Sequence, residues 1–113
     1  ILDKHARDYE RVIIVTESVF SMDGDKAPLE RIAELRREYP NSLLYVDEAH
    51  AFGVEGSQGL GLAQDIPDAD VIIGTFGKAC ASVGAFVAVR NNDLRDLMVN
   101  RARSFIFSTA LLQ

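Results

Sequence analysis

The chain has 113 residues, of which 48% are hydrophobic and 26% charged, and its 12 Lys and Arg against 17 Asp and Glu give a formal net charge of −5. This length suits one domain, and the acidic balance excludes the basic surface that nucleic acid or an anionic membrane would require. No stretch reaches the roughly 18 uninterrupted apolar residues of a membrane span. We therefore expect one soluble domain that has neither nucleic acid nor a membrane as a partner.

The single cysteine and the first residues bear on the cellular compartment. Cys80 has no second cysteine to pair with, so an internal disulfide is excluded, and a lone cysteine of this kind is usually a small buried residue. Residues 1–4 contain neither a signal-peptide core nor an initiator Met. These features predict a cytoplasmic protein and a segment of a longer chain.

The first half of the chain predicts a strand, a helix and a second strand. Residues 12–15 form an apolar run without alternation, which is typical of a strand covered on both faces and therefore of a parallel α/β sheet. Pro28 suits a first helical turn, and apolar residues then recur at helical spacing until Pro40 ends the pattern. Residues 43–46 form a second apolar run, which is followed by two acids. The whole unit predicts a right-handed crossover between parallel strands.

The second half predicts a long loop and two further strands. Four glycines between His50 and Asp70 indicate a loop with a short turn at residues 62–65. Residues 71–75 and 84–89 have strand-like composition. The connection between them is shorter than the dozen or so residues that a parallel crossover needs, so the last strand should be antiparallel.

A helix should follow the last strand. Asn92 suits its cap, Leu94, Leu97 and Met98 should face inward, and residues 105–107 should return to an extended conformation. The predicted fold class is therefore α/β, with helices beside a mixed, mostly parallel sheet whose last main strand is antiparallel. Because four apolar strands leave open edges, the chain should either associate nonspecifically or be covered by a partner.

Polar side chains follow the ends of the three predicted parallel strands. In open α/β sheets, ligands bind beyond the carboxyl ends of the strands, so these groups should converge on one rim of the sheet. They are Glu17, Ser18 and Ser21 after the first strand, Asp47 and His50 after the second, and Thr75 and Lys78 after the third.

Three of these residues can be interpreted either as functional groups or as ordinary structural or surface residues. Small and apolar neighbours of Lys78 would disfavour its ammonium form and favour a nucleophilic amine, but a solvated lysine at a strand end fits equally well. A carboxylate that emerges from the sheet interior at Asp47 needs a pyridinium nitrogen, a metal ion or an arginine as partner, unless it caps a helix or lies at the surface. His50 could address the same ligand or form a hydrogen bond within its loop.

Residues 47–50 also spell the DEAH box of helicase-type ATPases, in which acids hold Mg²⁺ and activate water. That class requires the phosphate loop G-x-x-x-x-G-K-[ST]. Here Gly77-Lys78 lacks the earlier glycine and comes after the acids instead of before them. Asp23 and Asp25 are too close together for an EF-hand, and no Cys/His cluster resembles a zinc site, so no metal is expected.

Three ordered motifs resemble the α-oxoamine synthases, which are pyridoxal-phosphate enzymes of fold type I. The motifs are residues 17–25 (ESVFSMDGD), 46–50 (VDEAH) and 75–78 (TFGK). The resemblance runs over nearly the whole chain and implies that residues 1–113 are a single partial domain, the central part of the large cofactor-binding domain. The family's ring-stacking residue, glycine-containing phosphate loop and small domain lie outside these residues. A non-catalytic interaction fragment is the remaining alternative.

The resemblance implies a catalytic role for three residues. Lys78 would link covalently to pyridoxal 5′-phosphate, Asp47 would pair with the pyridinium nitrogen, and His50 would touch the phenolic oxygen. The implied reaction is the decarboxylative condensation of an amino acid with an acyl thioester. Residues 79–82 and 51–53 depart from the family's usual glycine-rich or smaller sequences, which could alter the substrate pocket.

The resemblance implies a binding role for four hydroxyl groups. Ser21 would contribute a hydroxyl near the cofactor ring, and Thr75 would contribute one to its phosphate. Ser108 and Thr109 resemble the segment that reaches the phosphate bound by the neighbouring subunit. The implied partner is therefore a second copy of the chain, in a homodimer with shared sites.

Overall fold

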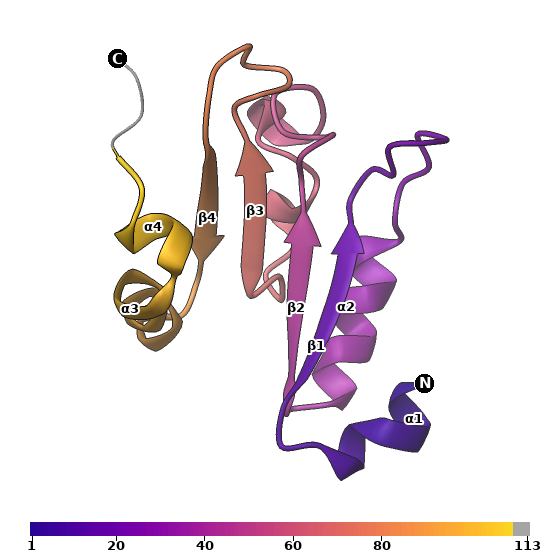
Figure 1. Cartoon of the computed structure of the whole chain (residues 1–113). Coiled ribbons are helices and arrows are strands. Elements are labelled where there is room, and N and C mark those ends of the chain that lie inside the picture. The colour runs from indigo at the N-terminus through magenta and orange to yellow at the C-terminus, as the bar shows by residue number, and fades with distance from the viewer. Residues whose placement is uncertain (110–113) are drawn as a thin grey trace.

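The computed structural model, which describes residues 1–109, contains a four-stranded sheet with helices beside it (Figure 1). None of the helices in this part of the chain is both long and apolar enough to cross a membrane. The strands, in their order across the sheet, are β1 Val12–Glu17, β2 Ser42–Asp47, β3 Val71–Thr75 and β4 Ala85–Val89. The α-helices are α1 Leu2–His5, α2 Leu29–Glu38, α3 Asn92–Arg101 and α4 Arg103–Ile106, and the 3₁₀ helices are η1 Ala6–Asp8, η2 Ser57–Gly59 and η3 Ala63–Asp65.

Strand pairing confirms the predicted fold class. β1 and β2 are parallel along their whole length, and β3 continues the parallel arrangement beside β2. β4 returns antiparallel to β3, with Thr75 opposite Ala85. The short connection between these two strands allows no crossover, which is the physical reason for the change of direction.

The hydrophobic core lies on one face of the sheet, where α2 and the segment around η3 pack against β2 (Figure 1). Alternate residues of β2 are buried, so this strand presents one set of side chains to the core and the other set to the opposite face. The buried core residues are Leu29, Ala33, Leu44, Val46, Ala63, Ile66 and Ala69. Packing on this face sets the height at which β2 ends, and therefore the position of the polar residues that follow.

The opposite face of the sheet is open in residues 1–109, which corrects the expectation of a first strand covered on both faces. Ile13 and Val15 of β1 are 62% and 66% exposed. Val87 of β4 is exposed as well. The apolar run in β1 has the composition of a strand buried on both sides, but no described element covers Ile13 and Val15 on this face.

The carboxyl-terminal part of the described chain differs in three details from the sequence-based prediction. The helix cap is Asn91 rather than Asn92, because the side chain of Asn91 accepts hydrogen bonds from the backbone N–H groups of Asp93 and Leu94. Leu97 is exposed rather than inward-facing. Residues 105–107 are not extended: 105 and 106 form the last turn of α4, since three apolar residues are too few to distinguish a strand from a helix.

Asp70 is a polar link between α2 and the strands, and it offers a test of the fold. Its carboxylate accepts hydrogen bonds from Arg36 Nε (3.1 Å) and Nη2 (3.0 Å) and from the backbone N–H of Leu44 (2.8 Å). Removing the carboxylate would leave a partly buried guanidinium and a backbone donor unpaired. We expect Asp70→Ala to lower the free energy of unfolding by about 1–3 kcal/mol, measured by urea denaturation of the full-length protein.

Asp68→Ala is the matched control for this substitution. Asp68 also pairs with an arginine of α2, Arg37, but the Arg37 side chain is more than half exposed and the pair lies at the surface. Its loss should therefore lower stability less than the loss of Asp70. Equal effects of the two substitutions would show that Asp70 is not the link described here.

Candidate active site

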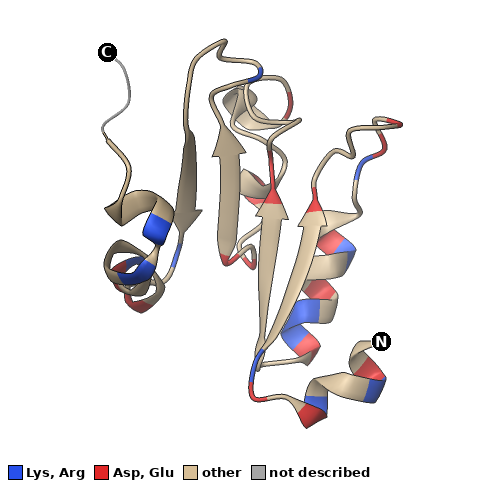
Figure 2. Cartoon of the chain, in the orientation of Figure 1, with Lys and Arg blue, Asp and Glu red and all other residues tan. Residues whose placement is uncertain are grey.

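The carboxyl ends of β1, β2 and β3 meet at one rim of the sheet (Figure 1). Figure 2 shows acidic residues at the tips of β1 and β2 and a basic residue in the loop after β3. The acids are Glu17 and Asp47, which are partners in the β1–β2 register, and the basic residue is Lys78. Opposite charges from three strand ends are therefore present at one rim.

A hydrogen bond joins two of the predicted catalytic residues across this rim. Lys78 Nζ lies 2.7 Å from His50 Nε2, although the residues are 28 positions apart in the chain. An ammonium group can only donate, so Nε2 accepts whenever Lys78 is charged, which requires the proton of a neutral His50 to be on Nδ1. When the amine is neutral, it can instead accept a hydrogen bond from a protonated Nε2. The contact is thus suited to proton transfer between an amine and an imidazole.

The loop that carries Lys78 has a defined backbone conformation. The N–H of Phe76 donates to the carbonyl of Gly84 (2.9 Å), and the N–H of Ser82 donates to the carbonyl of Phe76 (2.9 Å). The N–H of Ala81 donates to the carbonyl of Lys78 (3.0 Å), and Ala81 has a left-handed φ of 46°. Left-handed backbone is unfavourable for alanine, so the hydrogen bonds around it must hold this turn in place.

The surroundings of Lys78 correct one expectation. Its side chain and residues 79–82 are exposed, Cys80 included, so the apolar neighbours do not remove the amine from water. The loop projects beyond the ends of the strands, where no element within residues 1–109 covers it. Cys80 is likewise not the small buried residue that its isolation in the sequence predicts.

Only one oxygen of the Asp47 carboxylate accepts a hydrogen bond within the described residues. It is half-buried, and its Oδ1 accepts a hydrogen bond from the N–H of Ala49 (2.8 Å). Within residues 1–109 its Oδ2 has no hydrogen-bond donor and no cation in contact. Burial and, to a smaller extent, the Asp47 carboxylate raise the pKa of Tyr45, which keeps this phenol neutral. Asp47 is therefore able to bind a cationic group that the described chain does not supply.

The structure places Thr75 and Ser21 at the same end of the sheet but does not bring them into contact with Lys78. The Thr75 hydroxyl donates to the carbonyl of Gly84 (3.2 Å) and accepts from the N–H of Gly77 (3.1 Å). It therefore braces the lysine loop, and donation to a ligand would require it to release Gly84. Ser21 is exposed in the turn between β1 and α2, without a side-chain hydrogen bond in the described structure.

Ser108 and Thr109 lie in the last described residues of the chain. Both are exposed and follow α4, which lies to the side of β4 (Figure 1). The Ser108 hydroxyl donates to the carbonyl of Phe105 (3.3 Å). Neither residue contacts the other predicted site residues of the same chain.

Glu48 is the residue at this rim that the sequence interpretation missed. It is fully buried, and its carboxylate accepts hydrogen bonds from Ser18 Oγ and from the backbone N–H of Ala63. The alternation of side chains along a strand is the signal that separates it from Asp47, because neighbouring residues point to opposite faces. Since Glu48 is occupied inside the protein, the two acids do not form the joint magnesium site of a DEAH box. Within residues 1–109 no group of three or more His, Cys, Asp or Glu could hold a metal.

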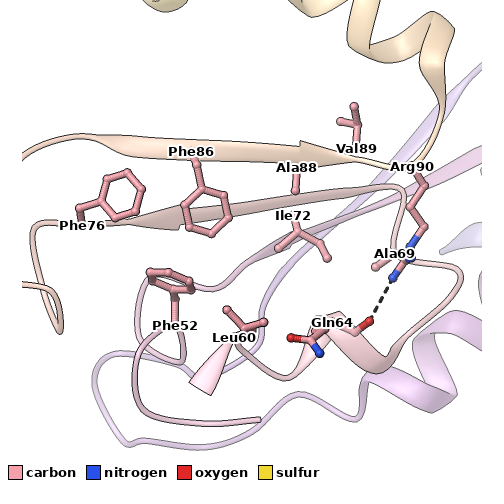
Figure 3. A pocket seen from close by; sticks show the side chains of 10 residues that line it. All are labelled: Phe52, Leu60, Gln64, Ala69, Ile72, Phe76, Phe86, Ala88, Val89 and Arg90. Carbon is pink, nitrogen blue, oxygen red and sulfur yellow. Dashed lines mark hydrogen bonds between the residues drawn. The ribbon is translucent and has the colours of Figure 1, made fainter. Parts of the chain in front are cut away.

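An aromatic pocket of about 550 Å³ lies beside β3 and β4 (Figure 3). The ring of Phe86 lies 4.8 Å from that of Phe52 and 5.7 Å from that of Phe76, and Arg90 lines the far end. Gly74 makes room for the cluster, because a Cβ there would lie 2.5 Å from the Phe86 ring. A glycine inside a strand is the sequence signal for such close approach. The pocket is separate from the polar rim, since neither Lys78 nor His50 lines it.

The fold and the rim define the class of protein to which the chain belongs. The sequence model for aminotransferase class I and II matches residues 1–113, so the chain is a member of that family. It is 53% identical over 114 residues to a protein of Neisseria meningitidis serogroup A and 54% identical to one of Pasteurella multocida, both provisionally named 8-amino-7-oxononanoate synthase. These alignments cover 98% of this chain but only 30% and 29% of the relatives.

Solved structures agree with this assignment. A serine palmitoyltransferase from Sphingomonas wittichii superposes with a TM-score of 0.82 at 29% identity, and the match covers 97% of this chain and 29% of that one. An 8-amino-7-oxononanoate synthase from Francisella tularensis superposes with a TM-score of 0.72 at 31% identity, covering 97% and 33%. The predicted resemblance to pyridoxal-phosphate enzymes of fold type I is confirmed by these matches.

Proposed function

We propose that the chain is the central part of the cofactor-binding domain of a pyridoxal-phosphate-dependent acyltransferase. The observation that supports this most directly is the 2.7 Å contact between Lys78 Nζ and His50 Nε2, at the rim that also carries Asp47. A lysine amine and a carboxylate without a cation are the groups that hold an aldehyde-bearing pyridine cofactor, and the imidazole adds a group that can exchange a proton with the amine. The family match supports the same class of enzyme.

The donor set fits this cofactor in four respects. Lys78 is exposed and can react with an aldehyde, and the free Oδ2 of Asp47 can accept the N–H of a pyridinium ring. His50 would donate from Nε2 to the phenolic oxygen once Lys78 is engaged. Ser21 and Thr75 would supply hydroxyl donors to the ring substituents and the phosphate. When bound, the cofactor accepts electrons from a carbanion formed at the adjacent carbon of the substrate.

The chain's own residues then have distinct tasks. Lys78 would hold the cofactor, and its Nζ would act as a base for the substrate proton. His50 exchanges a proton with that amine across the 2.7 Å contact. Asp47 would keep the ring nitrogen of a bound cofactor protonated by its negative charge, while its Oδ1 accepts from the N–H of Ala49. The hydrogen bond from Ala49 therefore fixes the position of the Asp47 carboxylate.

The proposed reaction is the decarboxylative condensation of L-alanine with a pimeloyl thioester, carried by CoA or by acyl carrier protein, in biotin synthesis. The names of relatives at 53% and 54% identity support this choice of substrates. The working enzyme is proposed to be a cytoplasmic homodimer. In it, exposed Ser108 and Thr109 of each subunit would reach the phosphate held by the other.

Reductive trapping tests the proposal. Full-length protein mixed with pyridoxal 5′-phosphate should develop a visible absorption band, and borohydride should fix the cofactor on the peptide that contains Lys78, as detected by mass spectrometry. Product formation from L-alanine and pimeloyl-CoA should exceed that from glycine and acetyl-CoA, and the opposite order would identify a glycine C-acetyltransferase. Nucleic-acid-stimulated ATP hydrolysis without the visible band would contradict the proposal and favour the ATPase. Absence of both activities would favour an interaction fragment.

A further inference from the structure

Glu48 is a buried carboxylate without a cationic partner. Its exposed fraction is 0%, and none of the ion pairs within residues 1–109 includes it. Its two oxygens are instead matched to two separate donors: Oε2 accepts from Ser18 Oγ, and Oε1 accepts from the N–H of Ala63. Because a buried carboxylate is costly unless it is hydrogen-bonded, this arrangement requires both donors to stay in place.

The contacts of Glu48 connect several segments that meet at the rim. Ser18, itself fully buried, directly follows β1, and Ala63 begins η3. The N–H of Glu48 donates to the carbonyl of Ile73 in β3 (2.8 Å). A single side chain with its backbone thus joins β1, β3 and the loop segment after β2.

The same residue also sets the turn that carries His50. The carbonyl of Glu48 accepts from the N–H groups of Ala51 (3.0 Å) and Phe52 (2.7 Å), which close the turn around His50. His50 itself is exposed, so packing of its own side chain does not determine its position. The direction of the imidazole toward Lys78 therefore depends on the backbone that Glu48 anchors.

Gly61 shows how closely the loop fits over this carboxylate. Its φ is +93°, and a Cβ at this position would lie 2.6 Å from Glu48 Cδ. The loop backbone therefore rests against the carboxylate, with no space for a side chain between them. This contact seals Glu48 from water and makes its position sensitive to small changes in the loop.

We propose that Glu48 is a positioning residue: its buried carboxylate, held by Ser18 and Ala63, anchors the turn that places His50 against Lys78 and keeps Asp47 at the rim. The expected effect of Glu48 on kcat rests on the proposed function. Its geometric part, the placement of His50, does not depend on any cofactor. We expect loss of the anchor to change activity by about 10- to 100-fold, the range for removing the hydrogen-bonded partner of a ligand in a metal site.

Three substitutions test the anchor in the full-length protein. Glu48→Gln preserves length and offers one acceptor and one donor, and the Ser18 hydroxyl can accept as well as donate, so we expect nearly normal kcat. Glu48→Ala should lower kcat by at least about tenfold and shift the visible band of the cofactor-loaded enzyme. Ser18→Ala, a milder change that covers the case in which Glu48→Ala does not fold, should lower kcat in the same direction with little change in KM.

Ser42→Ala is the matched control for Ser18→Ala. Ser42 is also a buried serine, at the opposite end of β2, and its hydroxyl donates to the carbonyls of Arg36 and Tyr39. A merely structural role of Ser18 and Glu48 predicts that Ser18→Ala and Ser42→Ala both lower the unfolding temperature and both leave kcat and the visible band unchanged. That result would overturn the proposal.

A cofactor-independent measurement separates this proposal from the proposed function. The ring-nitrogen NMR signals of His50 can be assigned by their loss in His50→Asn. Their chemical shifts should change in Ser18→Ala and stay unchanged in Ser42→Ala. If borohydride traps no cofactor on Lys78 of the unsubstituted protein, the proposed function fails, whereas these NMR shifts still decide the role of Glu48. Unshifted His50 signals in Ser18→Ala would refute the anchor whether or not cofactor binds.

Discussion

Lys78→Ala should reduce turnover by at least about a thousand-fold, which would be the largest effect of any single substitution in this chain. The substitution removes both the amine that holds the cofactor and the base that moves the substrate proton. Noncovalent binding of pyridoxal 5′-phosphate should persist, weakened, because Asp47 and the hydroxyl donors remain. Borohydride should then fix no cofactor on the peptide that contains residue 78, as measured by mass spectrometry.

Lys4→Ala is the matched control, because Lys4 is an exposed lysine of α1, at the end of the molecule away from the rim (Figure 1). It should leave turnover and trapping unchanged. Normal turnover in Lys78→Ala would show that the reaction needs no amine at this position. A loss of turnover shared by both lysine variants would point to overall charge instead.

Asp47→Asn should lower kcat by about a hundred- to a thousand-fold while changing the free energy of unfolding by less than about 1 kcal/mol. The reason is that Asn keeps an oxygen that can accept the N–H of Ala49, so the turn after β2 is retained and only the negative charge is lost. Without that charge, a pyridine nitrogen is no longer held protonated. Steady-state kinetics and urea denaturation of the same preparations measure the two effects.

Asp65→Asn provides the control for the loss of one carboxylate charge. Asp65 is exposed at the end of η3 and is not part of the proposed site, so kcat and stability should both remain close to those of the unsubstituted protein. Parallel losses of activity and stability in Asp47→Asn would identify Asp47 as a structural acid. An unchanged kcat in that variant would remove it from the catalytic set.

The fold was largely predictable, because its determinants are local. The apolar runs at residues 12–15 and 43–46 and the short β3–β4 connection are properties of consecutive residues, and they correctly predict parallel strands and an antiparallel last strand. The errors arise where the pattern is short or where distant partners decide the outcome. Residues 105–107 are too few to show a period, and exposure of β1 depends on what packs against it rather than on its own composition.

For the candidate site, the sequence supplies the residue types, whose roles stay predictions, but not their geometry. Sequence motifs select Lys78, His50 and Asp47, and the rule that parallel strands end at one rim brings them to the same edge. No local sequence pattern predicts that Lys78 is exposed or that its amine contacts Nε2 of His50. Those facts depend on how two loops from different strands meet.

The order of residues along this chain alone determines an α/β sheet whose polar strand ends match a family of pyridoxal-phosphate enzymes, because hydrophobic periodicity and motif spacing are carried by neighbouring residues. Only the tertiary structure separates Asp47 from Glu48. One acid keeps a free oxygen at the rim, and the other is buried against Ser18 and the backbone of Ala63. The physical reason is that hydrogen bonding and burial depend on which distant segments fold together, and adjacent residues of a strand face opposite sides of the sheet.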